Sequence, residues 1–155
     1  MNPTPEHAHP DPADPGFRVL PAADAFWRPS NQMGVLNTDL AGQLEMTDVA
    51  SRLWRLTPGQ ASTKHRHVTQ EELYVVLEGT GRMRVGDELL TLAPLSTVAV
   101  AAGTVRQIFN DTGAVALWLV MGAPREAVTS TLEMTPELLA TMYPDGPKHR
   151  PPELS

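Results

Sequence analysis

Short apolar runs separated by turn residues are the feature that most restricts how this chain can fold. From Phe17 onward they recur about every 8–12 residues, with Val and Leu dominant, which is typical of strands in an all-β sandwich or barrel. No stretch of the core repeats its apolar residues with the period of a helix. The predicted strands are Arg18–Leu20, Gly34–Asn37, Leu44–Thr47, Arg52–Thr57, Leu73–Leu77, Gly81–Val85, Glu88–Thr91, Thr97–Val100, Val105–Phe109 and Val115–Met121.

Proline marks the limits of this core. Of the 15 prolines, 13 lie toward the two ends of the chain, and only Pro58 and Pro94 lie in its middle. Residues 1–16 also hold almost no large apolar side chain, so they cannot bury enough surface to offset the entropy of ordering, and we expect a disordered tail. The 155-residue chain is therefore predicted to hold one barrel domain, at residues 17–123.

Residues 124–155 form a C-terminal extension in this scheme. Within it, Thr135–Tyr143 is predicted to be a short helix, because Thr135 can cap its start, Pro136 suits its first turn and Pro144 follows its end. The apolar face of this helix would pack on the outside of the barrel or contact a second copy of the chain.

Composition excludes several classes of function. The net charge of −6 disfavours a nucleic-acid binder, and no apolar run approaches the ~18 residues that span a bilayer. The N-terminus lacks the basic and apolar regions of a secretory signal, so we expect a cytoplasmic protein with no membrane partner. The absence of Cys excludes a disulfide framework, a Cys-ligated zinc site and a Cys nucleophile. The sequence also holds no nucleophile elbow, phosphate loop or dinucleotide fingerprint.

A segment in the middle of the chain holds the residues best suited to chemistry. His65 and His67 are two residues apart, so in an extended chain both imidazoles face the same side. Glu72 begins the next apolar run, in which alternation puts Glu72, Tyr74 and Val76 on one face. Two imidazoles and a carboxylate on one cavity suit a divalent Fe, Mn, Ni or Zn ion and leave coordination positions open. A His-x-His pair is common, however, so these residues alone also leave a metal-free site open.

The same segment resembles the first sequence motif of the cupins, a family of small β-barrels with a double-stranded, jelly-roll-like β-helix. The motif reads G-x5-H-x-H-x3–4-E-x6-G, and its positions are filled by Gly59, His65, His67, Glu72 and Gly79. The resemblance covers most of the core and implies a single cupin-type barrel. It also implies a divalent metal on His65, His67 and Glu72, chemistry of the dioxygenase, decarboxylase or isomerase type, and a homodimer.

The second cupin motif is incomplete in this chain. Gly103 and Asn110 match its end, but Arg106 stands where the family carries a third metal-binding histidine. Arginine cannot ligate a metal, because its guanidinium group stays protonated. If Arg106 faces inward with Ile108, its charge needs a partner. Three partners are open: Glu72, the anionic group of a substrate beside the metal, or a carboxylate elsewhere.

Strand alternation also gives candidate ligand contacts. We expect Trp54 and Leu56 to face the cavity, which requires Arg52 on the same face to reach solvent at the strand end. Arg106, Tyr74 and Trp54 are the predicted substrate-binding residues. Three functions remain open: a metal-dependent enzyme acting on a small anionic molecule, a non-catalytic binding or sensing protein, and a metal-free barrel in which Arg106 pairs with Glu72.

Overall fold

The computed structural model describes residues 15–128 and 130–155. The tail predicted for residues 1–16 therefore lies outside the described residues, apart from Pro15 and Gly16. Within the described part, nine strands form two sheets in which all paired strands are antiparallel, as the all-β prediction requires. None of the described helices is long and apolar enough to cross a membrane.

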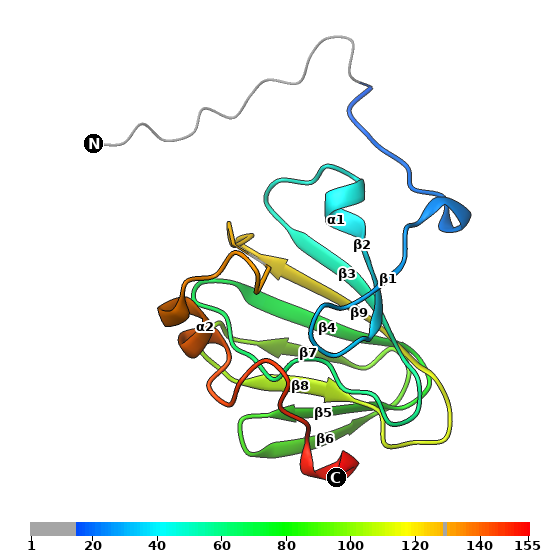
Figure 1. Ribbon diagram of the computed structural model, residues 1–155. Helices are drawn as coiled ribbons and strands as arrows, with labels where there is room; N and C mark the ends of the chain where they lie inside the picture. Colours follow the sequence, from blue (N-terminus) through cyan, green and yellow to red (C-terminus); the bar gives the residue numbers. More distant parts are fainter. Residues whose placement is uncertain (1–14, 129) are drawn as a thin grey trace.

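The two sheets face each other across the core (Figure 1). The larger has the order β1-β2-β3-β9-β4-β7, and its strands are β1 (Arg28–Pro29), β2 (Leu36–Asp39), β3 (Ala50–Leu56), β9 (Ala116–Ala123), β4 (Glu71–Glu78) and β7 (Thr97–Val100). The smaller has the order β6-β5-β8, with β6 (Glu88–Leu92), β5 (Gly81–Val85) and β8 (Arg106–Phe109). Residues 61–65 run antiparallel to β8 through two isolated bridges and extend this sheet.

Apolar side chains from both sheets fill the space between them. Strand β4 alternates as predicted, because Glu72, Tyr74 and Val76 are buried while Glu71 and Leu73 are exposed. The buried members of this core are Val35, Leu56, Tyr74, Val76, Met83, Val100, Ile108, Ala116 and Trp118.

The turn between β4 and β5 depends on a motif glycine. Gly79 has a φ of 74°, and a Cβ there would lie 2.2 Å from the carbonyl oxygen of Val115. Both the left-handed backbone and the close approach exclude a side chain at this position. The glycine that closes the first motif therefore has a structural reason: it returns the chain from β4 into the second sheet.

Two predicted strands are wrong. Residues 44–47 follow α1 (Leu40–Gln43) as a turn, because the Asp39 carboxylate accepts a hydrogen bond from the Gly42 amide and starts a helical turn there. Arg18–Leu20 pairs with no described strand and precedes a 3-10 helix at Ala22–Asp24. The apolar Val19 of this segment stays exposed to solvent.

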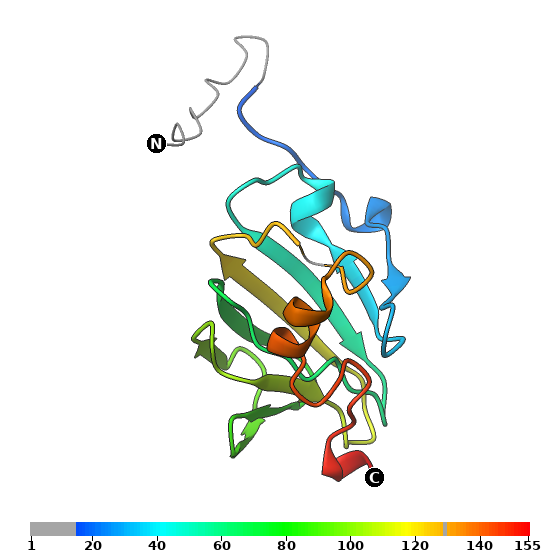
Figure 2. The same ribbon diagram turned by 60° about the vertical axis from the view of Figure 1, so that its left-hand side comes forward.

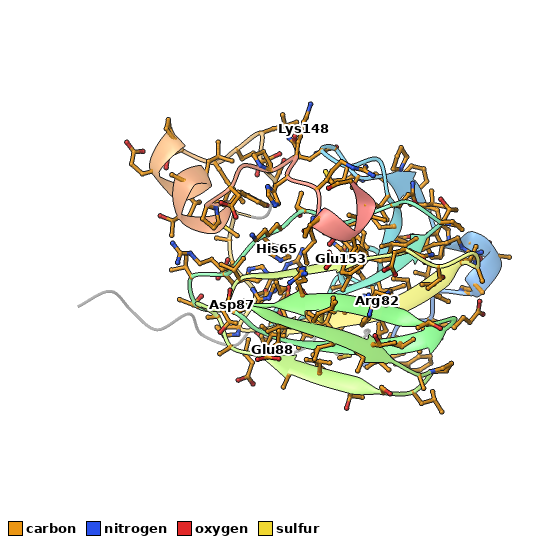
Figure 3. The ribbon with its side chains drawn as sticks, turned by 90° about the horizontal axis from the view of Figure 1, so that it is seen from below. His65, Arg82, Asp87, Glu88, Lys148 and Glu153 are labelled. Atoms are coloured by element: carbon orange, nitrogen blue, oxygen red, sulfur yellow. The ribbon has the colours of Figure 1, made fainter. Side chains whose placement is uncertain are left out.

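The C-terminal extension folds back onto the barrel. Helix α2 (Pro136–Met142) forms where it was predicted, with the Thr135 hydroxyl accepting from the Leu138 amide, and it lies at one side of the barrel (Figures 1 and 2). Beyond it, a 3-10 helix at Pro152–Leu154 places Glu153 in an ion pair with Arg84 of β5 (Figure 3 labels Glu153). The extension thereby covers an end of the barrel and becomes part of the site described next.

Candidate metal centre and its cavity

Three side chains from two segments converge inside the barrel. His65, His67 and Glu72 each offer a ligand atom, and these atoms lie within 4.8 Å of one another. The backbone of His65 exchanges two hydrogen bonds with Arg106 of β8, at 2.9 and 2.8 Å. Glu72 is the second residue of β4. The pairing with β8 and the alternation of β4 thus aim the three side chains at one point, as the sequence predicts.

The His65 imidazole is held as a neutral ligand. Its Nδ1 lies 3.0 Å from the Thr63 carbonyl oxygen, which can only accept, so Nδ1 carries the proton and Nε2 keeps its lone pair. Burial lowers the pKa of His65 to about 4, although the charge of Glu72 opposes this shift. At neutral pH, His65 therefore needs to lose no proton before it binds a cation.

The His67 imidazole lies between two carboxylates. Its Nε2 is 2.7 Å from Oε1 of Glu72, and its Nδ1 is 3.1 Å from Oε2 of Glu126. Burial acts to lower the pKa of His67, but the hydrogen bonds and charges of Glu72 and Glu126 outweigh it and raise the pKa. The second proton of His67 then occupies the direction in which a cation would sit.

Glu126 is a site residue that sequence analysis missed. It belongs to the C-terminal extension, and its Oε1 accepts from the backbone amides of Val68, Thr69 and Gln70 at 2.8, 2.7 and 3.0 Å. Burial acts against its charge, but the Thr69 and Gln70 amides and His67 lower its pKa to about 2. Glu126 therefore fixes both the His67 ring and the loop after it. No local pattern marks this residue, because its position depends on how the extension returns after β9.

Glu72 accepts several hydrogen bonds. The Tyr74 hydroxyl donates to Oε2 of Glu72, and the side-chain amide of Gln70 donates to its Oε1 at 3.2 Å. Burial acts to raise its pKa, but His67 and the neighbouring groups lower it to about 2. A Cβ at Gly122, which pairs with Glu72 across the sheet, would lie 2.4 Å from the Gln70 amide nitrogen, so the glycine makes room for this donor.

Arg106 lies beside the cluster and is fully buried. Its Nη2 donates to the carbonyl oxygens of Ala101 and Val100 at 2.9 and 3.3 Å, while Nε and Nη1 find no hydrogen-bond partner among the described residues. The nearest carboxylate is Glu72, at 3.9 Å between Nε and Oε2. This distance allows charge attraction but is too long for a hydrogen bond. Of the three partners that the sequence left open, Glu72 is the one beside Arg106.

The cluster opens onto a cavity of about 230 Å³. Trp54 and Tyr74, two of the predicted substrate-binding residues, line it, whereas Arg106 does not. Arg52 also lines it and keeps partial contact with solvent, with 29% of its side chain exposed, while its guanidinium donates to Asn37 and Asp39 at 3.0 and 3.1 Å. The register of β2 and β3 places Asp39 directly opposite Arg52, which provides a counter-charge at the cavity wall.

The C-terminal extension and the loop before β2 complete the cavity wall. Tyr143, at the end of α2, lines it and lies with its ring centroid 6.2 Å from that of His65. Figure 3 labels His65 among the side chains enclosed between the strands and the extension. The Gln32 side chain of the loop donates to the Thr131 hydroxyl at 2.9 Å, which ties the two flanking segments together.

Comparison with known proteins gives the family. The family model described as the cupin domain matches residues 52–122, which contain the cluster and most of both sheets. A sugar phosphate isomerase of the cupin superfamily from Silicibacter pomeroyi DSS-3 is 25% identical, with 70% of this chain and 76% of that chain covered and a TM-score of 0.64. The chain is a cupin.

Other cupin-like structures extend the comparison. The protein TT1209 from Thermus thermophilus is 31% identical, with 64% of this chain and 90% of that chain covered and a TM-score of 0.53. A predicted oxalate decarboxylase from Thermotoga maritima is 17% identical, covers 70% of this cupin and 100% of its own chain, and has a TM-score of 0.62, which shows a shared fold alone. A search of curated protein sequences finds no significant match.

The donor set of this cupin fits a divalent transition metal. One neutral imidazole, a second imidazole that becomes neutral on losing a proton, and one ionised carboxylate are a set typical of Fe, Mn, Ni or Zn sites. The contact of His67 with Glu126 is the kind of outer hydrogen bond that orients a ligating histidine. The Arg106 charge opposes a cation, since its Nε lies 3.9 Å from Oε2 of Glu72.

Proposed function

We propose that this cupin binds one divalent metal ion through His65, His67 and Glu72 and acts on a small ligand in the adjoining cavity. The convergence of three ligand atoms within 4.8 Å, at the wall of a cavity of about 230 Å³, is the observation that carries the proposal. A bound divalent ion would supply Lewis-acid polarisation of a ligand oxygen. Trp54 and Tyr74 are the proposed ligand contacts of the wall, and Arg106 is proposed to act through Glu72.

Among the reaction types expected of a small cupin, we favour isomerisation of a small hydroxy-carbonyl compound. The sugar phosphate isomerase from Silicibacter pomeroyi, at 25% identity, supports this choice. Isomerisation of this kind needs a base that takes a proton from one carbon and returns it to the neighbouring carbon. It also needs a group that donates a proton to the carbonyl oxygen while the neighbouring hydroxyl loses one. Tyr143 is the candidate donor: burial and the charges of Glu126 and Glu72 raise its pKa, so its hydroxyl stays protonated at the cavity wall.

A metal-free barrel is the second candidate, and the hydrogen bonds of Glu72 favour it. His67, Gln70 and Tyr74 all contact this carboxylate, and Arg106 adds a positive charge at 3.9 Å. These contacts stabilise a buried charge without a metal. In that case the cavity would serve binding or sensing without turnover.

Metal content separates the two candidates. We expect protein purified without a chelating tag to contain close to one divalent ion per chain by elemental analysis. His65→Ala should lose it, because the variant removes a ligand and leaves the contacts of Glu72 in place. Glu71→Gln is the matched control, since Glu71 is exposed beside Glu72. Negligible metal in all three proteins, even after incubation with Fe, Mn, Ni or Zn, would exclude the metal proposal.

Turnover separates an enzyme from a binding protein. Metal-loaded protein should interconvert the isomers of a small hydroxy-carbonyl compound, followed by NMR over a panel of sugar phosphates and sugar acids. Tyr143→Phe should lower kcat with a smaller change in KM if the hydroxyl acts as donor. Ligand binding without conversion would favour the sensing alternative. A cytoplasmic location and a homodimer remain proposals, and light scattering of the purified protein tests the dimer.

A further inference from the structure

One part of the cavity wall carries a concentration of positive charge. Arg28 of β1, Arg52 of β3 and Arg125, two residues after β9, all line the cavity. Burial lowers the pKa of Arg52 against the opposing charge of Asp39, and the charges of Arg28 and Arg125 lower it further, so both of these guanidinium groups lie close enough to Arg52 to repel it.

These three charges are only partly compensated. Asp39 is the only carboxylate among the described residues that forms an ion pair with any of them, at 3.1 Å from Arg52. Arg28 donates to the neutral side-chain oxygen of Asn31 at 3.0 Å, and Arg125 donates to the Met46 carbonyl oxygen at 2.7 Å. Two of these three cationic charges therefore have no carboxylate partner among the described residues at this edge of the cavity.

The arginine wall and the candidate metal centre face the same interior. Arg52 pairs with Val120 of β9, and Val120 pairs with Tyr74 of β4, so the three side chains lie in one row on the same face of the sheet. Neighbouring strands are about 4.8 Å apart, which puts the Arg52 and Tyr74 backbones about 10 Å apart. The apolar Val120 lies between them. A small ligand lying along this row can reach Arg52 at one end and the neighbours of Glu72 at the other.

We propose that Arg28, Arg52 and Arg125 form a binding subsite for the terminal oxyanion, a phosphate or a carboxylate, of a small ligand whose other end reaches the His65–His67–Glu72 cluster. The fixed fork of a guanidinium group matches the oxygens of either anion and stays charged at any working pH. Asn37 and Asp39 orient the fork of Arg52, which keeps the central cation in place before the ligand arrives. The cavity of about 230 Å³ limits the rest of the ligand to a few carbon atoms.

The proposed subsite places the anion contact at Arg28, Arg52 and Arg125, whereas the sequence offered Arg106 as a candidate. Arg106 is fully buried and lines no part of the cavity, whereas Arg52 and its two neighbours do. The inference deepens the proposed function, on which its account of the whole ligand rests. Anion binding at the arginines, however, needs no metal, so the two proposals can fail separately.

Calorimetric titration of the full-length, chelator-treated protein with inorganic phosphate tests the subsite. Arg52→Gln should weaken phosphate binding roughly ten- to one-hundred-fold, the value of hydrogen bonds to a charged group. Arg28→Gln should also weaken phosphate binding. This second variant keeps the test valid if Arg52→Gln fails to fold, because the Arg28 side chain is exposed and donates only to Asn31 among the contacts described. Arg55→Gln is the matched control, since Arg55 carries the same charge on the opposite face of β3.

Two further measurements complete the test. Malonate replaces phosphate in a second titration, and the tighter of the two probes identifies the anionic group of the ligand. Failure of both probes to bind at millimolar concentration, or equal binding by wild type, Arg28→Gln and Arg52→Gln, would overturn the subsite. Phosphate binding that persists in Glu72→Gln, together with negligible metal in every variant, would retain the subsite and reject the metal centre.

Discussion

The two ends of the cavity are built from different parts of the chain. The histidine–glutamate end comes from β4 and the segment beside β8, inside the region that matches the cupin model, and backbone pairs such as His65 with Arg106 set its geometry. The arginine end draws Arg28 and Arg125 from outside that region. Strand register therefore positions the candidate metal ligands, while the flanking segments supply two of the three arginines and also Glu126, which contacts His67. Changes in the flanks can alter which ligand is recognised without moving the candidate metal ligands.

Replacing Glu72 by Gln should separate the two ends most clearly. Loss of the ligating carboxylate should weaken metal binding by more than about a hundredfold, beyond the usual effect of an outer-shell change. Phosphate affinity should stay within about twofold, because the arginines lie two strands away and share no partner with Glu72. Competition with a metal chelator measures the first value and calorimetry the second. A parallel loss of both affinities would show that the two ends form one coupled network.

Replacing Glu126 should reveal how far the extension belongs to the metal end. Glu126→Gln removes the charge that faces Nδ1 of His67, and we expect metal binding to weaken about 10- to 100-fold. Glu126→Ala should weaken it further, because it also frees the three amides of residues 68–70. Glu133→Gln, an exposed change in the same extension, is the control. Unchanged metal affinity in Glu126→Gln would mean that strand register alone orients His67.

The sequence allowed prediction of the features that repeat with a local period. Alternation along β4 placed Glu72 and Tyr74 on the buried face, and the His-x-His spacing placed both imidazoles on the same cavity. The helix at Pro136–Met142 followed from its cap and its flanking prolines. Each of these depends on side chains within a few residues of one another.

Features that depend on contacts across the chain could not be predicted. Asp39 lies opposite Arg52 because of the register between β2 and β3, which no local pattern encodes. Glu126 reaches His67 only because the extension folds back after β9. The predicted strand at Arg18–Leu20 had the right apolar composition, but a strand also needs a neighbour, and the described sheets offer none.

Acidity should affect the metal end through one histidine. The raised pKa of His67 means that a metal must displace its proton, whereas His65, with a pKa of about 4, is already neutral above that pH. Between the pKa of His67 and pH 4, metal affinity should therefore fall about tenfold for each unit by which the pH is lowered, because one proton competes with the metal. Chelator competition from pH 5 to 8 measures it. A slope of two would show that both imidazoles are protonated.

The metal-free protein should also be most stable near pH 6.5, the ordinary pKa of histidine. The raised pKa of His67 contributes stability that is full below 6.5 and is lost as pH rises through its folded value. The lowered pKa of His65 contributes stability that is lost as pH falls from 6.5 toward 4. The lowered pKa values of Glu72 and Glu126 contribute stability that is lost as pH falls further, from 4.5 toward 2. Calorimetric melting in chelator should show this maximum, and a flat profile from pH 5 to 8 would contradict it.

Replacing Arg106 by His should have the smallest effect and should strengthen metal binding rather than weaken it. The change removes a positive charge beside Glu72 and offers a third imidazole next to His65, so we expect a gain of up to about tenfold. Arg106→Met separates the two causes, because it removes the charge without adding a nitrogen ligand. An equal gain in both variants would assign the effect to charge, and a gain in Arg106→His alone would assign it to ligation. Weaker metal binding in both variants would mean that the Arg106 guanidinium, whose Nε lies 3.9 Å from Oε2 of Glu72, orients this carboxylate. That orienting effect would then outweigh the repulsion between the guanidinium and the metal.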